Sequence, residues 1–344
     1  MTEVESNLLR KRALAKMRSP YQMGIICIDI TNKCDLACSN CTRLLENQSS
    51  FWDMTPDNFR LAVRSLDGYP GIIAVIGGNP AMHPKLKDIC DIFVQEVPNK
   101  SQRGLWTNNV FKHGELAKDT FGFFNLNPHN DARGIESLEG LKKFGGYRSG
   151  HSSHSPLLTA VKDLYSETDM WDRISQCDIN QHWSASIIQN KGNLRAYFCE
   201  VAASFDLARG TDHGIPVEPG WWRRNISEFD DQVARFCPGC GIPARLKGHM
   251  DFEETDTYTA SNADIARQAE NKRRTVIELK ASDQRLTINH KVTEYSKNLR
   301  PSLAQKMVSA YPITRPIVGM ARPVVRMARS VKSALVGSLT RSGS

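Results

Sequence analysis

The chain of 344 residues carries 45 basic and 37 acidic residues, which gives a formal net charge of +8. Seven of the basic residues and none of the acids fall in residues 301–344, so the rest of the chain is nearly neutral, and we expect no nucleic-acid partner. No stretch has the roughly 20 apolar residues that a transmembrane helix needs, and residues 1–20 lack the apolar core of a signal peptide. We therefore expect a soluble, cytoplasmic protein.

Short apolar runs and helical patterns alternate through the first part of the chain. Residues 1–20 are expected to form an N-terminal helix, and helices with Pro in the first turn are expected at 56–66 and 84–97. The expected strands lie at 24–30, 71–76, 103–107 and 121–127. This alternation is typical of parallel βα units, so we predict an α/β fold.

The pattern changes after residue 150. Residues 151–175 have helical periodicity, and 184–189 and 193–198 flank Asn190-Lys191-Gly192, which predicts a β-hairpin. Residues 251–300 read as a charged helical segment, and 301–344 as a basic tail that is amphipathic or disordered. Within the tail, residues 320–340 could form an apolar stripe edged by basic residues, which would suit peripheral contact with the inner face of an anionic membrane.

The nine cysteines are an odd number in tight groups, which favours metal ligation in a reducing compartment over disulfides. Cys34, Cys38 and Cys41 follow the first expected strand. Three thiolates in one turn leave a fourth coordination position open, which suits a metal group that binds a further ligand. A zinc site completed by a distant side chain is the alternative.

Two further motifs follow the next two strands: Gly77-Gly78-Asn79-Pro80 and Thr107-Asn108-Asn109. Together with the cysteine motif, they make the chain resemble the radical S-adenosylmethionine (radical SAM) superfamily. The resemblance implies a partial (β/α) TIM-type barrel and a [4Fe-4S] cluster on Cys34, Cys38 and Cys41. The open iron would bind S-adenosylmethionine, with cofactor contacts from Gly77, Gly78, Asn79, Pro80 and Asn108.

The resemblance also implies a reaction. An electron from a flavodoxin or ferredoxin-type donor would cleave S-adenosylmethionine, and the resulting 5′-deoxyadenosyl radical would take a hydrogen atom from a substrate. Two positions depart from the family pattern: Asn40 replaces an aromatic residue, and Asn79 replaces the glutamate of Gly-Gly-Glu-Pro. Asn79 lacks the charge to pair with an ammonium group.

A second cysteine set could form a closed four-ligand site for zinc or a cluster. It consists of Cys177, Cys199, Cys237 and Cys240. The hairpin that leads into Cys199 and a helix resembles the twitch domain, a shortened SPASM domain, which implies an auxiliary [4Fe-4S] cluster. We expect the barrel at 21–176 and the twitch domain at 177–250, a layout similar to that of 2-deoxy-scyllo-inosamine dehydrogenases.

Candidate substrate ligands lie near the expected strand ends. Asn125, Asn127 and His129 alternate with apolar residues, and amides could hydrogen-bond the hydroxyls of a sugar, with Trp106 as a platform beside them. A solvated strand end and a core tryptophan are the alternatives. Candidates for a base or hydrogen donor are His151, His154, Arg173, His182 and Cys27.

The sequence therefore predicts a radical SAM oxidoreductase that abstracts hydrogen from a carbohydrate-like substrate, such as a sugar, nucleotide sugar or cyclitol. The auxiliary cluster would accept an electron as an alcohol is oxidised. The alternatives are a redox-neutral epimerase or dehydratase, a maturase of ribosomal peptides, and a zinc-dependent binding protein that is not an enzyme.

Overall fold

The computed structural model describes residues 2–129, 131–141, 147–148, 154–270, 272 and 274–280. The strands are β1 Ile25–Asp29, β2 Ile72–Ile76, β3 Arg103–Thr107, β4 Phe123–Leu126, β5 Tyr147–Arg148, β6 Ser184–Asn190, β7 Asn193–Tyr197, β8 Ile215–Pro216, β9 Thr255–Tyr258 and β10 Thr275–Glu278. The α-helices are α1 Glu3–Leu14, α2 Pro56–Ser65, α3 Leu86–Glu96, α4 Gly114–Thr120, α5 Ala132–Glu139, α6 Val161–Leu164, α7 Glu167–Ser175, α8 Asp178–His182, α9 Glu200–Ala208, α10 Asp230–Phe236 and α11 Ala263–Glu270.

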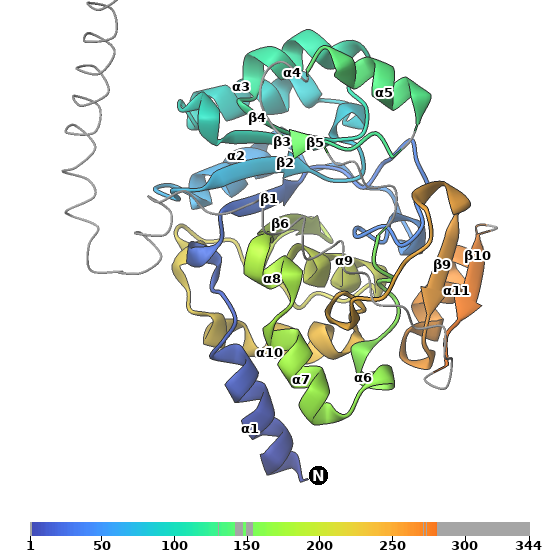
Figure 1. The fold of residues 1–344 in the computed structure, drawn as a ribbon. Helices are drawn as coiled ribbons and strands as arrows, with labels where there is room; N and C mark the ends of the chain where they lie inside the picture. Colours follow the sequence, from blue (N-terminus) through green and yellow to red (C-terminus); the bar gives the residue numbers. More distant parts are fainter. Residues whose placement is uncertain are drawn as a thin grey trace, which may run out of the picture. The chain divides into compact units, whose positions relative to one another are not determined.

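One sheet organises the described residues. Its eight strands have the order β5-β4-β3-β2-β1-β6-β7-β8, and the strands β1 to β6 run parallel to one another. In Figure 1, β1 lies between β2 and β6, and helices α3, α4 and α5 lie beyond β2 to β4. The strand-then-helix connections and the parallel pairing confirm the predicted α/β fold, an open partial barrel.

The two faces of the parallel strands have different surroundings because successive side chains point to opposite sides. Ile26 and Ile28 of β1 belong to the large apolar core with Phe59 of α2 and Phe93 of α3, whose rings meet edge to face at 5.6 Å. Cys27 and its neighbours on the opposite face form a small separate cluster with Trp106. The helices therefore cover one face, and the other face is left for a site.

Local signals explain why several helices begin where they do. The Thr55 side chain accepts a hydrogen bond from the Asn58 backbone N–H, and Pro56 occupies the first turn of α2. Ser166 caps α7 in the same way. The helical pattern expected over 151–175 becomes the two shorter helices α6 and α7, because Tyr165 is extended between them.

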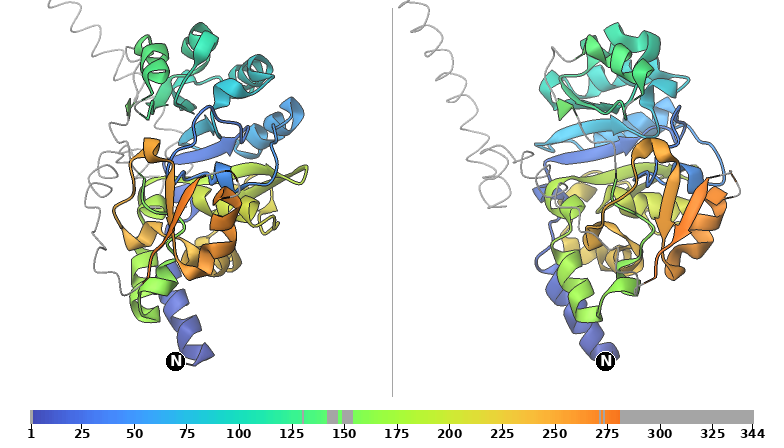
Figure 2. Two further views of the ribbon diagram at one scale, coloured as in Figure 1. Left: turned by 90° about the vertical axis from the view of Figure 1, so that its right-hand side faces the viewer. Right: turned by 45° about the vertical axis from the view of Figure 1, so that its right-hand side comes forward.

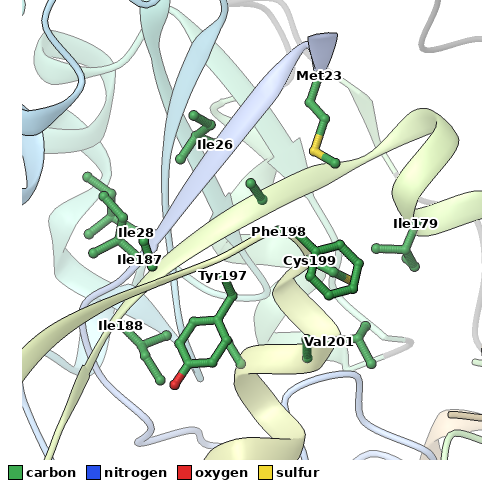
Figure 3. Packing of buried hydrophobic residues seen from close by; sticks show 14 of the residues in the cluster. Met23, Ile26, Ile28, Ile179, Ile187, Ile188, Tyr197, Phe198, Cys199 and Val201 are labelled. Carbon is green, nitrogen blue, oxygen red and sulfur yellow. The ribbon is translucent and has the colours of Figure 1, made fainter. Parts of the chain in front are cut away.

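The predicted hairpin is present, and it joins the main sheet. β6 and β7 pair antiparallel around Lys191 and Gly192, while β6 also pairs with β1 in parallel, with Ile25 opposite Ser184. Figure 3 shows the end of this hairpin: Phe198 and Cys199 follow β7, and Ile187 on β6 lies close to Ile28 on β1. A boundary at residue 177 therefore does not divide the sheet into two separate sheets.

The segment expected to be a charged helix is only partly helical. Residues 255–258 and 275–278 form a separate two-stranded parallel sheet, β9 and β10, with α11 between them. This unit, orange in Figure 2, faces the viewer in the left view and lies to the right in the right view. The prediction of a helix does not hold for these two strands, because four-residue strands flanked by charges carry little periodicity. Residues 281–300 of the segment lie outside the described residues. The tail predicted over 301–344 lies outside the described residues.

Among the described residues, none of the helices combines the length and the apolar character that crossing a membrane requires.

Candidate active site

The polar ends of the parallel strands open onto one cavity of about 270 Å³. The segments that follow β1, β2, β3 and β4 all contribute to its wall, as expected for the carboxyl ends of parallel strands. The residues predicted from sequence that line it are Cys34, Cys38, Cys41, Gly77, Gly78, Trp106, Asn108, Asn125, Asn127, His129 and His154. Side chains from distant parts of the chain therefore meet in one place.

The loop with the first three cysteines is held from outside by the unit of β9 and β10. Arg274 donates to the carbonyl oxygens of Ala37 (2.6 Å) and Cys38 (3.2 Å), and it pairs with Asp256 at 3.2 Å. Asp256 in turn accepts from the Asn40 backbone N–H at 2.6 Å. The Arg274 and Asp256 side chains are 3% and 7% exposed, so a buried ion pair fixes the backbone between Ala37 and Asn40.

Gly77 and Gly78 bring β2 against the start of the cysteine loop. The Gly78 N–H donates to the Thr31 carbonyl at 2.8 Å, and the Asn79 N–H donates to the Lys33 carbonyl at 2.7 Å. A Cβ on Gly77 would lie 2.2 Å from the Thr31 oxygen, and a Cβ on Gly78 would lie 2.1 Å from the Lys33 oxygen. The glycines are therefore required by backbone packing within the protein, a reason that the motif alone did not reveal.

Asn79 and Pro80 lie behind the cavity wall and are not among its lining residues. The Asn79 side chain is buried; its amide donates to Asp35 Oδ1 at 3.0 Å, and its oxygen accepts from Thr107 Oγ1 at 2.9 Å. Asn108 donates to the same Asp35 oxygen at 2.9 Å. The neutral amide at position 79 therefore orients a carboxylate that belongs to the cysteine loop itself.

The alternation predicted along β4 is present. Phe124 and Leu126 belong to the large core, whereas Asn125, Asn127 and His129 line the cavity. His129 lies 5.3 Å from the ring of His154, which also lines the cavity. Trp106 stacks on Phe123 at 5.6 Å and also forms part of the cavity wall, so it has core contacts and lies beside the amides.

Two charged cavity residues were missed by the sequence reasoning: Arg43 and Glu200. Arg43 Nη2 lies 2.9 Å from Glu200 Oε2, and Arg43 Nε lies 3.7 Å from Asp29 Oδ2. Burial acts to lower the pKa of Arg43, but the two carboxylates outweigh it and raise that pKa; burial raises the pKa of Asp29 to about 6. Their positions were a usable signal, since each lies within two residues of a cysteine.

The second cysteine set comes from three separate segments. Cys177 precedes α8, Cys199 precedes α9, and Cys237 and Cys240 follow α10. The four thiols are close enough to interact electrostatically, and burial raises the pKa of each, for Cys177 to about 11. Figure 3 shows Cys199 among apolar side chains, including Ile179 and Val201.

Both cysteine sets consist of buried thiols, which suit ligands of an iron–sulfur group. Burial raises the pKa of Cys34 to about 12 and also raises that of Cys41. Such thiols ionise when a metal coordinates them. Among the described residues, no three His, Cys, Asp or Glu side chains are arranged to hold a single metal ion.

The other candidate residues lie away from the cavity lining. Arg173 stacks over the ring of Tyr165 at 3.9 Å, and His182 is at the end of α8, where burial lowers its pKa. Cys27 is buried; its thiol lies 3.3 Å from Ser184 Oγ and 3.6 Å from Glu200 Oε2. His151 lies outside the described residues.

Comparison with known proteins gives partial likenesses in structure only. No family model matches the chain, and no curated protein matches it. The chain is similar to BtrN in complex with AdoMet and 2-DOIA, at 16% identity, over 65% of this chain and 89% of that chain, with a TM-score of 0.40. It is also similar to Streptococcus suis SuiB bound to precursor peptide SuiA, at 11% identity, over 64% and 70%, with a TM-score of 0.34.

A third solved structure, methylornithine synthase (PylB), is 11% identical over 90% of this chain and 93% of that chain, with a TM-score of 0.32. At these TM-scores we take no argument about activity from the likenesses. The functional argument therefore rests on the residues that meet in the cavity.

Proposed function

We propose that this chain is a radical SAM enzyme that oxidises a hydroxyl-bearing, carbohydrate-like substrate in the cavity. The single observation that carries this proposal is the meeting of three elements in one wall: the Cys34, Cys38 and Cys41 loop, the Gly77-Gly78 backbone, and the amides at the ends of β3 and β4. A structural zinc site would not need a cavity beside it.

Each group of residues has a distinct part in the proposal. The three loop cysteines would hold a [4Fe-4S] cluster, and Gly77, Gly78 and Asn108 would contact S-adenosylmethionine. When bound, the cluster supplies the electron that cleaves S-adenosylmethionine to the radical that takes hydrogen from the substrate. Asp35, oriented by Asn79 and Asn108, offers a carboxylate next to the first cysteine.

The second cysteine set supports oxidation over a redox-neutral reaction. Cys177, Cys199, Cys237 and Cys240 are four thiols in mutual electrostatic contact, which suits a closed site that no external ligand enters. Glu200, next to Cys199, lines the cavity, so this second site would lie close to the substrate and could accept an electron from it.

Anaerobic reconstitution of the full chain with iron and sulfide tests the proposal. We expect about eight irons per chain for two [4Fe-4S] clusters, and 5′-deoxyadenosine once the reduced protein meets S-adenosylmethionine. A product lighter by two hydrogens would indicate oxidation; an unchanged mass would indicate epimerisation, and a loss of water dehydration. Zinc without sulfide, or no 5′-deoxyadenosine under any reductant, would refute the radical SAM assignment.

A further inference from the structure

We propose that Arg43, Glu200, Asn125 and Asn127 form the substrate-recognition set of the cavity, and that this set selects an unphosphorylated polyol or amino polyol. The inference rests on the proposed function, because it names the substrate class of the same cavity. It narrows that class, since it excludes nucleotide sugars and sugar phosphates.

The first argument comes from hydrogen bonds that the protein leaves unmade. Within the described part of the chain, Arg43 Nη1, Asn125 Oδ1 and Asn127 Oδ1 are buried without a hydrogen-bond partner. Arg43 Nε also lacks a hydrogen bond, but it faces Asp29 Oδ2 at 3.7 Å. Arg43, Asn125 and Asn127 all line the cavity. A buried polar atom without a hydrogen bond is unfavourable, so three such atoms around one cavity indicate a ligand that satisfies them.

The second argument is the mixture of donors and acceptors. Arg43 offers N–H donors, while the two asparagine side chains offer carbonyl acceptors. Glu200 Oε2 accepts from Arg43 at 2.9 Å and from Ser184 Oγ at 2.6 Å, whereas no bond to Oε1 is found among the described residues. Hydroxyl groups both donate and accept, so a ring that carries several of them matches this wall.

The third argument is charge. The charged or titratable side chains of the cavity, apart from its cysteines, are Arg43, Glu200, His129 and His154, and Asp29 lies behind Arg43. Two carboxylates face one guanidinium, which leaves a surplus of negative charge around Arg43. The Arg43 side chain is 6% exposed and its charge is already balanced by Glu200 and Asp29, so it cannot compensate a phosphate, whereas an ammonium group would be favoured.

Ligand binding to the reconstituted, oxidised full chain with S-adenosylmethionine tests the proposal without turnover. Saturation-transfer NMR is run on a panel of cyclitols, aminocyclitols, hexoses, hexosamines, their phosphates and UDP-glucose, with short unphosphorylated peptides as a separate panel. We expect a neutral or amino polyol to bind at least about tenfold more tightly than its phosphate. Binding by peptides alone, by phosphates in preference, or by no polyol would overturn the proposal.

Variants then assign the recognition to these residues. Asn127→Ala and Arg43→Lys should each lower the affinity for the polyol that binds in the panel by about tenfold, because each variant removes a directed hydrogen bond. Glu200→Gln should in addition reduce the discrimination against the phosphorylated ligand. Asn58→Ala is the control, since Asn58 bonds Gln189 at 2.7 Å and does not line the cavity. Unchanged binding in all three variants would refute the assignment.

Iron content and 5′-deoxyadenosine formation separate the possible failures. Arg43 and Glu200 lie near cysteines, so their variants are compared only if they retain the wild-type iron content. If they lose iron, the test rests on Asn127→Ala alone. If 5′-deoxyadenosine forms but binding is insensitive to the variants, the recognition set is wrong and the proposed function stands. If 5′-deoxyadenosine never forms, the proposed function itself fails.

Discussion

Arg274 donates to the backbone carbonyls of the loop that carries Cys38, with 3.2 Å between Nη2 and the Cys38 oxygen. The two residues are separated by most of the described chain, yet the contact is buried. The β9 and β10 unit therefore belongs to the site, because it holds the cysteine loop in place.

Arg274→Gln should loosen the cysteine loop. It removes the ion pair with Asp256 and leaves that carboxylate buried, so we expect a loss of about 3–5 kcal/mol in the free energy of unfolding. Iron bound at the first site should fall as well. Thermal or denaturant unfolding and iron analysis measure the two effects. Arg267→Gln on α11 is the control: Arg267 is exposed, and its variant should behave as wild type. If the two variants were equally stable, Arg274 would not stabilise the cysteine loop.

Gly78→Ala tests the contact between β2 and the cysteine loop. The added methyl group would lie 2.1 Å from the Lys33 carbonyl oxygen, so the loop must shift, at an expected cost of about 1–3 kcal/mol. Calorimetric unfolding and S-adenosylmethionine binding provide the measurements. Gly114→Ala is the matched control, since nothing lies within 4 Å of a Cβ added at Gly114. This variant should be neutral or slightly stabilising. A fully stable Gly78→Ala variant would rule out this close contact.

Asn79→Asp tests the orientation of Asp35. The variant keeps an acceptor for Thr107 but replaces the donating amide with a second carboxylate in a buried position. We expect a destabilisation of about 3 kcal/mol, measured by urea unfolding. Asn58→Asp is the control at a half-buried site, where the same change should cost less. If both variants lose the same stability, the Asn79 amide has no special role at Asp35.

Cysteine variants count the metal groups. Replacing Cys34, Cys38 and Cys41 by Ala should lower the iron of the reconstituted chain from about eight to about four, and should abolish 5′-deoxyadenosine. Cys90→Ala is the control, because Cys90 is buried in the core and belongs to neither set. Iron unaffected by the triple replacement would disprove ligation by this loop.

Replacing Cys237 and Cys240 by Ala tests the second set separately. About four irons should remain, and S-adenosylmethionine cleavage should continue, while the oxidised product should disappear. Electron paramagnetic resonance of the reduced protein should then show a single cluster signal. Product formation at the wild-type rate would show that the second set is not the electron acceptor.

Much of the main sheet could be predicted from sequence because its signals are local. The strand at 103–107 matches β3 in full, and β1, β2 and β4 lie within their predicted ranges. Alternation along β4 placed Asn125 and Asn127 on the side opposite Phe124, because a strand has a period of two residues. Motifs at the ends of parallel strands were expected to converge, since those ends share one edge of the sheet.

The remaining features depended on contacts between distant segments. Arg43 and Glu200 are separated by 157 positions, and although each lies near a cysteine, nothing in the sequence shows that the two side chains meet. The pairing of β6 with β1 and the contact of Arg274 with Cys38 are likewise set by packing. The sequence by itself determined the strands up to β4 and predicted the two sets of thiol ligands, since periodicity encodes the strands and spacing groups the cysteines. Only the tertiary structure decided which charges and amides surround the cavity, because burial and the pairing of charges arise when the segments pack together.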